Sequence, residues 1–177
     1  MNKVVIADAG PLIALARINQ LGLLARLFGT VTVTSPVAAE VLAGGDFPDT
    51  AALALALTEP WLETFNFPDA WLDECKDWVH VHQIDMGEAS ALVLAQHCNA
   101  QSQSALLVMD DFRGRNAAQH AGLALIGTTG LLLLAKQAGA VDAVKPLLRS
   151  LRQKGYFLSD RLIEIALTQA GEVVDAG

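Results

Sequence analysis

Four short apolar runs, each followed by a helical pattern, are the strongest constraint that this sequence places on its fold. They cover residues 3–7, 30–34, 105–109 and 123–127. Runs of four or five residues without strict alternation are typical of strands buried on both faces. Strands that alternate with helices predict parallel pairing through right-handed crossovers. We therefore expect an α/β fold: a three-layer α/β/α sandwich with a central parallel sheet.

Start and stop residues mark the helices after these runs. Ser35, with Pro36 at the first helical position, predicts an N-cap for the helix after the second run. Either Thr128 or Thr129 is expected to cap the helix after the fourth run, and Gly139 to end it. Three short elements are predicted between the second and third runs: a helix over 49–57, an extended piece near 61–66 and a helix around 70–78.

A chain of 177 residues is long enough for one sizeable domain and too short for two ordinary ones. We expect a single domain over 1–177, with a core over about 1–140 and a C-terminal helical extension over about 141–177. Two amphipathic helices are predicted in that extension, the second capped by Ser159. No internal repeat or low-complexity linker interrupts the chain.

Composition and cysteine usage predict a cytoplasmic protein without a membrane span. Apolar residues make up 53% of the chain and charged residues 18%, which suits a packed interior. No apolar stretch reaches the roughly 18 residues that a membrane span needs, and the first run meets Asp8 too early for a signal peptide. Cys75 and Cys98 have no metal or redox spacing, so we expect small core residues in a reducing compartment.

Charge is divided unevenly along the chain. The net charge of −7 argues against a protein that coats nucleic acid. Residues 1–100 carry 4 basic and 12 acidic side chains, whereas residues 101–161 carry 8 basic and 4 acidic ones. Within the second stretch, Lys145, Arg149 and Arg152 fall on one side of a predicted helix. This stripe is either a solvated helix face or a surface that contacts phosphate groups.

Two aspartates stand directly after predicted strands. In an open parallel sheet the ligand site lies beyond the carboxyl ends of the strands, and Asp8 and Asp110 are both expected there. Mutual repulsion should raise the pKa of at least one of them, and a divalent cation would relieve it. Oxygen ligands without histidine or cysteine at matching spacing suit Mg²⁺ or Mn²⁺ better than zinc. The alternative is that each aspartate only caps the following helix.

Two glutamates are expected to join them. Glu40 shares a helix face with Val37 and Val41, and a charge on a core-facing stripe needs a partner. Glu88 has two interpretations: it is a member of the acidic cluster, or it forms a capping box with Asp85 and stabilises a helix only. The four acids together favour a metal cluster over four unrelated caps.

The histidines add little to this site. His80 and His82 are expected on one face of a strand, where a partly buried structural role is favoured over a metal pair. His97 and His120 fall late in predicted helices, where a positive ring suits the helix dipole.

Four segments of the chain together resemble the PIN-domain ribonucleases, and among them a prokaryotic subgroup similar to the VapC-type toxins. The segments read "IADAGPLIALARI" at 6–18, "SPVAAEVL" at 35–42, "DMGEASALVLA" at 85–95 and "LLVMDDFRGRNAAQHAGLALIGTTGLLLLAKQAG" at 106–139. Carried over position by position, the family's acidic site falls on the residues already singled out: Asp8, Glu40, Glu88 and Asp110. Asp111 adds a further carboxylate that could reach the metal from the turn.

The resemblance implies metal-dependent hydrolysis of RNA phosphodiester bonds, with Mg²⁺ or Mn²⁺ as cofactor, a small antitoxin as partner, and a homodimer. The apolar helices at 12–27 are a second reason to expect dimerisation. Arg113 and Arg115 follow the fourth acid, and they either pair with the site carboxylates or contact the substrate phosphate. Together with the stripe at 145–152 they are the candidate substrate-binding residues.

Other functions remain as alternatives or are excluded. A catalytically degenerate module of the same fold would act only by holding a protein or RNA partner. A phosphotransfer enzyme of the haloacid dehalogenase type needs a second aspartate two residues after the first, and Gly10 stands there.

Overall fold

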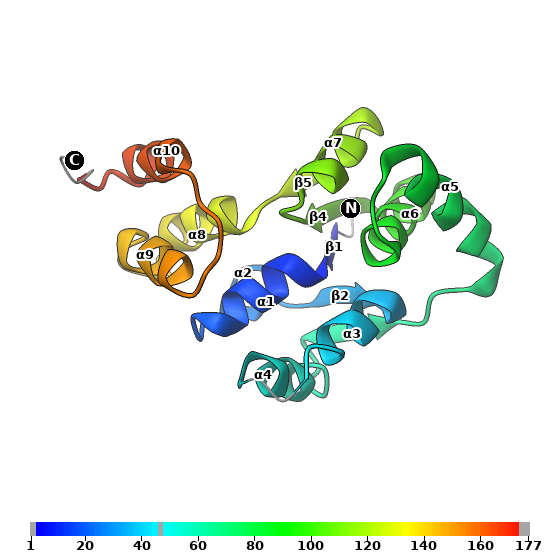
Figure 1. Cartoon of the computed structure of the whole chain (residues 1–177), viewed down its shortest axis with the longest axis horizontal. Coiled ribbons are helices and arrows are strands. Elements are labelled where there is room, and N and C mark those ends of the chain that lie inside the picture. The colour runs from blue at the N-terminus through cyan, green and yellow to red at the C-terminus, as the bar shows by residue number, and fades with distance from the viewer. Residues whose placement is uncertain (1–2, 46–47, 174–177) are drawn as a thin grey trace.

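The computed structural model describes residues 3–45 and 48–173. Within them one sheet is flanked by helices on both faces (Figure 1). The strands are β1 Lys3–Ala7, β2 Val31–Thr34, β3 Leu62–Phe65, β4 Ser104–Val108 and β5 Ala124–Ile126. The helices are α1 Ala9–Arg17, α2 Gly22–Phe28, α3 Ser35–Leu42, α4 Pro48–Ala56, η1 Asp69–Trp71 (a short 3₁₀ turn), α5 Leu72–His82, α6 Met86–Ala100, α7 Phe112–His120, α8 Thr128–Gln137, α9 Lys145–Gln153 and α10 Asp160–Ala170.

The sheet is parallel throughout, with strand order β3-β2-β1-β4-β5. The four predicted runs are β1, β2, β4 and β5, and the predicted extended piece is the edge strand β3. Because β1 and β4 are neighbours in register, with Ala7 opposite Val108, the residues that follow them emerge at the same edge of the sheet.

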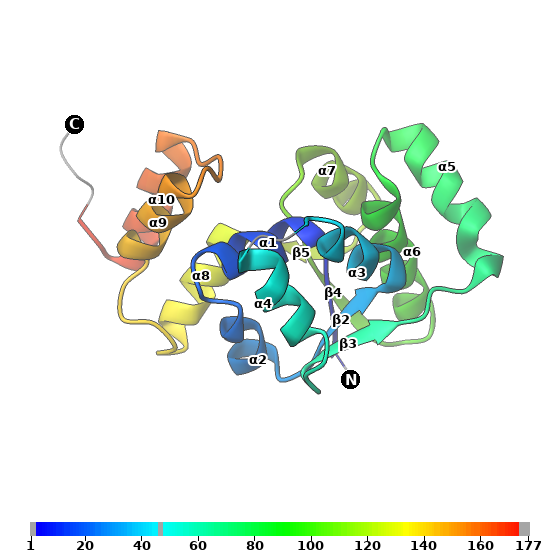
Figure 2. The ribbon, with the colours of Figure 1, turned by 60° about the horizontal axis from the view of Figure 1, so that its bottom comes forward.

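Alternate residues of the central strands face two separate cores. Val5 and Ala7 of β1 pack in a cluster with α1, α2, α4 and α8, whereas Ile6 packs with α5, α6 and α7. Figure 2 shows the same division of the helices between the two sides of the sheet. The predicted three-layer α/β/α sandwich with a parallel sheet is confirmed.

Two local predictions are wrong. The N-cap of α3 is Thr34, whose hydroxyl accepts a hydrogen bond from the Val37 N–H, rather than Ser35. The Ser35 hydroxyl instead accepts one from the N–H of Phe67, which follows β3. The segment that holds His80 and His82 is the end of α5 and not a strand. On a helix, residues two apart lie on different faces, so the paired rings do not form a metal site.

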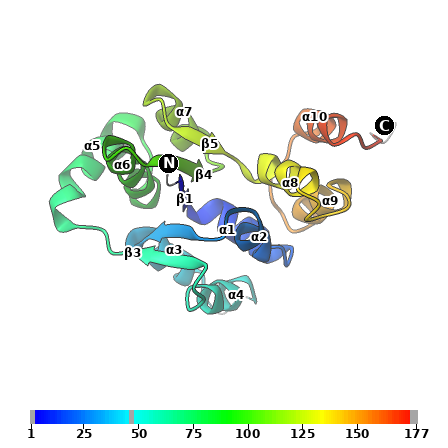
Figure 3. The same ribbon diagram turned by 180° about the vertical axis from the view of Figure 1, so that it is seen from behind.

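The C-terminal helices extend the molecule beyond the sheet (Figure 3). Ser159 caps α10 as predicted, through a bond from the Leu162 N–H, and α10 packs on α8. The apolar residues at 12–27 are mostly buried inside this chain. They therefore leave no broad apolar face for a second copy, and the surface argument for a dimer fails.

Cys75 and Cys98 are free and buried, as expected of small core residues. Among the described residues, no single helix is long and apolar enough to cross a membrane; α1 and α2 meet that length and composition only jointly, with a bend of 117° between them.

Candidate functional site

Four acidic side chains predicted from the sequence come from four elements around the carboxyl edge of the sheet. Asp8 is the residue between β1 and α1, and Asp110 follows β4, the neighbouring strand. The backbone N–H of Asp8 donates to the carbonyl of Val108 at 3.0 Å, which joins the two strand ends. Glu40 lies on α3 and Glu88 in the first turn of α6, which packs against α3.

Asp8 is buried, with only 6% of its surface exposed. Among the described residues its Oδ1 atom has no hydrogen-bond partner. Burial raises the pKa of Asp8 from 3.8 to about 7; the Ala9 N–H offsets part of this increase, and the charges of Asp85, Glu40 and Asp110 add to it. The predicted increase in an aspartate pKa is therefore present at Asp8, with burial as its main cause. A buried carboxylate oxygen without a partner calls for a proton or a cation.

Glu88 is also buried, and it completes the capping box proposed as its structural role. Its Oε2 accepts the Asp85 N–H at 3.0 Å, while Asp85 Oδ1 accepts the Glu88 N–H at 2.8 Å. Burial raises the pKa of Glu88 from 4.5 to about 8; the Asp85 N–H lowers it in part, and the charges of Asp85, Asp111 and Asp8 raise it further. The same side chain therefore holds α6 in place and carries a charge that its surroundings disfavour.

Glu40 does not face the core, contrary to the expectation. It is exposed, on the side of α3 that faces the start of α6. A Cβ atom built on Gly87 would lie 2.6 Å from Glu40 Oε2 and 3.2 Å from Asp85 Oδ1. Glycine at position 87 thus leaves the space that this carboxylate occupies. Partial burial and the charge of Asp85 raise the pKa of Glu40.

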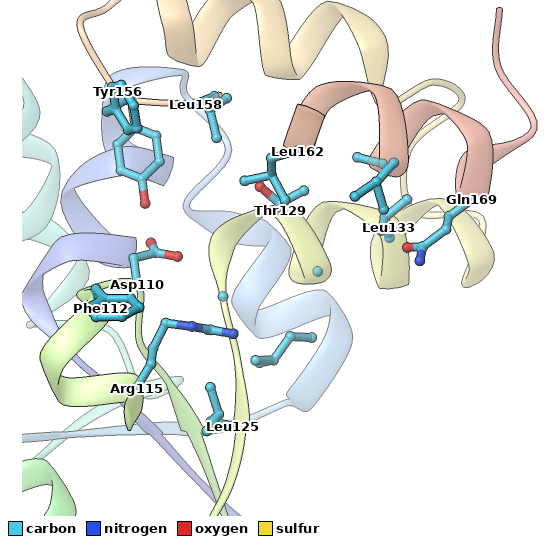
Figure 4. A pocket seen from close by; sticks show the side chains of 16 residues that line it. Asp110, Phe112, Arg115, Leu125, Thr129, Leu133, Tyr156, Leu158, Leu162 and Gln169 are labelled. Carbon is cyan, nitrogen blue, oxygen red and sulfur yellow. The ribbon is translucent and has the colours of Figure 1, made fainter. Parts of the chain in front are cut away.

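Asp110 is held by the start of α8. Its Oδ1 accepts the Thr128 N–H at 2.7 Å, and its Oδ2 accepts the Thr128 hydroxyl at 2.5 Å. The predicted cap of α8 by its own threonines is wrong, because this carboxylate from the neighbouring loop takes that place. Figure 4 shows the Tyr156 hydroxyl pointing at Asp110 from the segment between α9 and α10. Burial and then the charge of Asp110 raise the pKa of Tyr156 well above its ordinary value.

Asp111 acts as the N-cap of α7. Its Oδ1 accepts the backbone N–H groups of Arg113 and Gly114 at 2.8 and 3.0 Å. The side chain is exposed, and its charge is felt by Glu88. Its role as a metal ligand stays a prediction.

Within the described residues, neither arginine after the fourth acid pairs with a site carboxylate, which was the first of the two alternatives for them. Arg113 donates to the carbonyl of Gln83 at 3.1 Å, and Arg115 donates to the carbonyl of Met109 at 2.8 Å. Both positive side chains near the start of α7 are therefore stabilised by backbone carbonyl groups rather than by carboxylates. Their contact with substrate phosphate stays a prediction.

The basic stripe lies on α9, which Figures 1 and 3 place beyond α8, far from α3 and α6. Arg152 pairs there with Asp160 at 2.5 Å. Lys145 donates to the carbonyl of Val173, and Arg149 is also engaged within the chain. Any contact of the stripe with substrate would be remote from the acids.

Two residues near the acids were not assigned to the site from the sequence. Asp85 was taken only as a helix cap, yet its charge raises the pKa of three acids: Asp8, Glu40 and Glu88. Its N-cap position at the same edge was a usable signal. Tyr156 had no such signal in the sequence, because it lies 46 positions after Asp110 and only the fold of the C-terminal segment brings it close to that acid.

The chemical type of the four carboxylates suits a hard divalent cation, although the side chains do not converge on one point. Within residues 3–45 and 48–173, no three His, Cys, Asp or Glu side chains converge closely enough to hold a metal ion. The unpartnered buried oxygen of Asp8 and the all-oxygen donor set nevertheless suit Mg²⁺ or Mn²⁺. Asp8, Glu40, Glu88 and Asp110 are the residues that would hold it.

The parallel α/β/α sandwich places its carboxylates around the carboxyl edge of the sheet, which is where open α/β sheets bind their ligands. A family model described as PIN domain matches residues 4–172, and the chain belongs to that family. PIN domains are generally nucleases and typically use divalent metal ions. No curated protein and no solved structure matches the chain.

Proposed function

We propose that this protein is a ribonuclease that uses Mg²⁺ or Mn²⁺ to hydrolyse RNA phosphodiester bonds at the acidic edge of its sheet. The observation that carries the proposal is Asp8, a buried carboxylate whose Oδ1 atom has no partner in the described part of the chain and whose pKa is about 7. Three further carboxylates, Glu40, Glu88 and Asp110, stand around the same edge. Such a cluster either binds a cation in its charged form or takes up protons and becomes neutral.

The proposed division of labour follows from the environments of these residues. A bound divalent cation would lower the pKa of a water molecule and clamp the scissile phosphate. Asp8 and Asp110 are the proposed principal ligands, and Glu40 and Glu88 complete the shell or position the water. Thr128 holds Asp110 in one orientation through two hydrogen bonds, so that carboxylate is preorganised.

Charge explains how an acidic protein would bind a polyanion. Residues 101–161 are net positive by four, while the chain as a whole carries −7. Arg113 and Arg115 of α7 stand next to Asp110 in sequence and are the proposed phosphate contacts, with the more distant α9 stripe adding long-range attraction. The cation would neutralise the carboxylates that otherwise repel RNA.

We further propose a cytoplasmic toxin of a toxin-antitoxin pair, similar to the VapC type, which forms a homodimer and is blocked by a small antitoxin. These steps rest on the resemblance of the four segments. A short reading frame adjacent to the gene would favour the pair. A monomeric mass at micromolar concentration in sizing with light scattering would contradict the dimer.

One observation favours a second candidate, a degenerate module that binds a protein or RNA partner without cutting. Among the described residues no three ligand-type side chains converge, and Glu88 and Asp110 are both engaged in helix caps. Metal affinity without hydrolysis would distinguish this module from the nuclease.

The test is cleavage of a mixed RNA panel with Mg²⁺, with Mn²⁺ and with chelator. We expect the wild type to cut with metal, and Asp8→Asn and the chelator each to abolish cutting. Asp142→Asn, at an exposed position beyond the far end of α8, is the matched control and should cut like the wild type. Cutting that survives in chelator or in Asp8→Asn would overturn the proposal, and a folded wild type inactive on a broad panel would favour the binding module.

A further inference from the structure

A groove opens beside Asp110 that the proposed catalytic residues do not fill. It has a volume of about 630 Å³ and runs between the start of α7, the β5–α8 loop and the segment from Tyr156 to α10. Asp110 lies at one end, and the walls are mainly apolar, with Leu133 contributed by α8 and Leu162 by α10 (Figure 4). This volume is in the range of sites that take a nucleotide-sized ligand.

Two aromatic rings in this groove are unusually exposed. Phe112 is 74% exposed and Phe157 is 88% exposed, and they come from α7 and from the segment before α10. In the part of the chain that the structure describes, neither ring packs against another aromatic ring. Exposed rings that line a groove are the platforms on which the bases of single-stranded nucleic acids stack.

The charges in the groove suit an anionic ligand held near a cation-binding edge. Among the described residues, Arg115 is the one basic residue of the lining, and Figure 4 shows its guanidinium extending into the groove. The bond from Arg115 to the Met109 carbonyl fixes the guanidinium in that position. Asp110 is the one acid that residues 3–45 and 48–173 contribute to the lining, and Thr129 and Gln169 add neutral polar groups that can bond to base edges.

We propose that this groove is a nucleobase subsite, in which a base next to the scissile phosphate of single-stranded RNA stacks on Phe112 and Phe157. The inference rests on the proposed ribonuclease function and extends it to the form of the substrate. Continuity with Asp110 carries the choice of ligand, because a base seated in the groove keeps its phosphate within reach of Arg115 and the acidic edge. An apolar peptide is the competing occupant, since Leu162 and Ile165 of α10 add aliphatic surface.

The experiment measures binding without cleavage. A fluorescein-labelled single-stranded RNA decamer of mixed sequence is titrated with the Asp8→Asn protein in Mg²⁺ and followed by fluorescence anisotropy. We expect Phe112→Ala and Phe157→Ala each to raise the Kd about 5- to 100-fold, the usual scale for the loss of a stacked ring. Phe112→Tyr and Phe157→Tyr should stay within about threefold of the parent, because the stacking surface remains.

Two controls separate stacking from other effects. Leu55→Ala removes a side chain that is 65% exposed on α4, outside the groove, and should leave the Kd unchanged. A decamer of abasic ribose phosphates should bind weakly and with no dependence on either ring. Since both rings are exposed, the alanine variants should melt within about 2 °C of the parent.

Each outcome decides the proposal. An unchanged Kd in both alanine variants would overturn the subsite and leave a peptide as the occupant, as would an equal loss with the abasic decamer. Cleavage is scored separately in proteins that retain Asp8. If the protein cuts RNA but its affinity does not depend on the two rings, the subsite is rejected and the ribonuclease function stands. If the affinity depends on the rings but no RNA is cut in either metal, the subsite stands and the ribonuclease function is rejected.

Discussion

Thr128 fixes the carboxylate of Asp110 through two hydrogen bonds, one from its backbone N–H at 2.7 Å and one from its hydroxyl at 2.5 Å. The two residues are 18 positions apart and belong to different connections of the sheet. Thr128 is fully buried and Asp110 is half-buried, so the pair is partly shielded from water, and bonds to a charged carboxylate are strong for their type. The first residue of α8 thereby sets the orientation of an acid that follows β4.

Thr128→Val tests this relationship because it keeps the shape of the side chain and removes the hydroxyl. The Asp110 carboxylate loses one donor, and we expect the free energy of unfolding to fall by about 1–3 kcal/mol. RNA cleavage should fall as well, since the carboxylate gains freedom to rotate. The control for stability is Thr129→Val, whose hydroxyl makes no hydrogen bond within the described residues; cleavage is compared with the wild type only, because Thr129 lines the groove beside Asp110. Equal urea midpoints, or equal melting temperatures on heating, for the two variants would contradict the role of the Thr128 hydroxyl.

The single tyrosine of the chain reports on the same acid. Burial and the charge of Asp110 both disfavour the Tyr156 phenolate, so its pKa lies above the ordinary 10.0. We expect no phenolate absorbance at about 295 nm in the folded protein up to about pH 11. In Asp110→Asn, one of the two causes is removed and ionisation should begin at lower pH. A normal titration midpoint in folded wild type, checked by circular dichroism, would mean that Tyr156 does not face Asp110.

Glu88 combines two roles that a pair of variants can separate. Glu88→Gln keeps an oxygen that accepts the Asp85 N–H, so the capping box survives while the negative charge is lost. Glu88→Ala loses both, and the free energy of unfolding should fall by about 1 kcal/mol. Cleavage should be lost in both variants if the charge matters. Full activity in a stable Glu88→Gln protein would reduce Glu88 to a helix cap.

Gly87 is predicted to keep space for Glu40. A Cβ at position 87 would meet Glu40 Oε2 at 2.6 Å, and the flexible carboxylate would move away. Gly87→Ala should therefore weaken Mg²⁺ affinity by about 10-fold, while the helix itself gains up to about 1 kcal/mol. Gly10→Ala is the matched control, because a Cβ there has no atom within 4 Å. Unchanged metal affinity in Gly87→Ala would place Glu40 outside the metal shell.

The sheet and its acids could be predicted because they depend on local patterns. Each strand is a short apolar run. The carboxyl ends of neighbouring parallel strands necessarily lie at the same edge of the sheet, so the sequence alone predicts that Asp8 and Asp110 lie close together. The exposed position of Glu40 was not predictable from periodicity, since a residue at the border of an apolar stripe can lie on either side of it. The resulting contact with α6 depends on how two helices pack.

The remaining errors have tertiary causes. The alternation around His80 is short and resembles a strand, but α5 continues through it to His82 and is capped by Gln83 in the left-handed conformation. Pairing with acids was one of two alternatives for Arg113 and Arg115, yet packing places the backbone carbonyls of Gln83 and Met109 beside them. Tyr156 reaches the site from the C-terminal segment, and no local sequence pattern predicts such a contact.

Without metal, stability should depend on the charge of Asp8. The pKa of Asp8 is about 7 in the folded chain and 3.8 as the ordinary value, so the folded state binds the proton more tightly than the unfolded state. Its contribution to stability is complete below about pH 4 and is lost as the pH rises through 7. Asp8→Asn should therefore raise the free energy of unfolding by roughly 2–4 kcal/mol at about pH 8 and leave it unchanged near pH 4. Urea unfolding in chelator measures both values, and a gain independent of pH would contradict this account.

The central claim, a divalent-cation site that includes Asp8, is tested most directly by the effect of Mg²⁺ and Mn²⁺ on the melting temperature. This measurement does not depend on knowing the RNA target. We predict that either ion at about 10 mM stabilises the wild type, more at pH 8 than at pH 5.5 because the carboxylates must ionise to bind it. The increase should vanish in Asp8→Asn and persist in Asp142→Asn. An equal increase in wild type and Asp8→Asn, or none with either ion at pH 8, would contradict the claim.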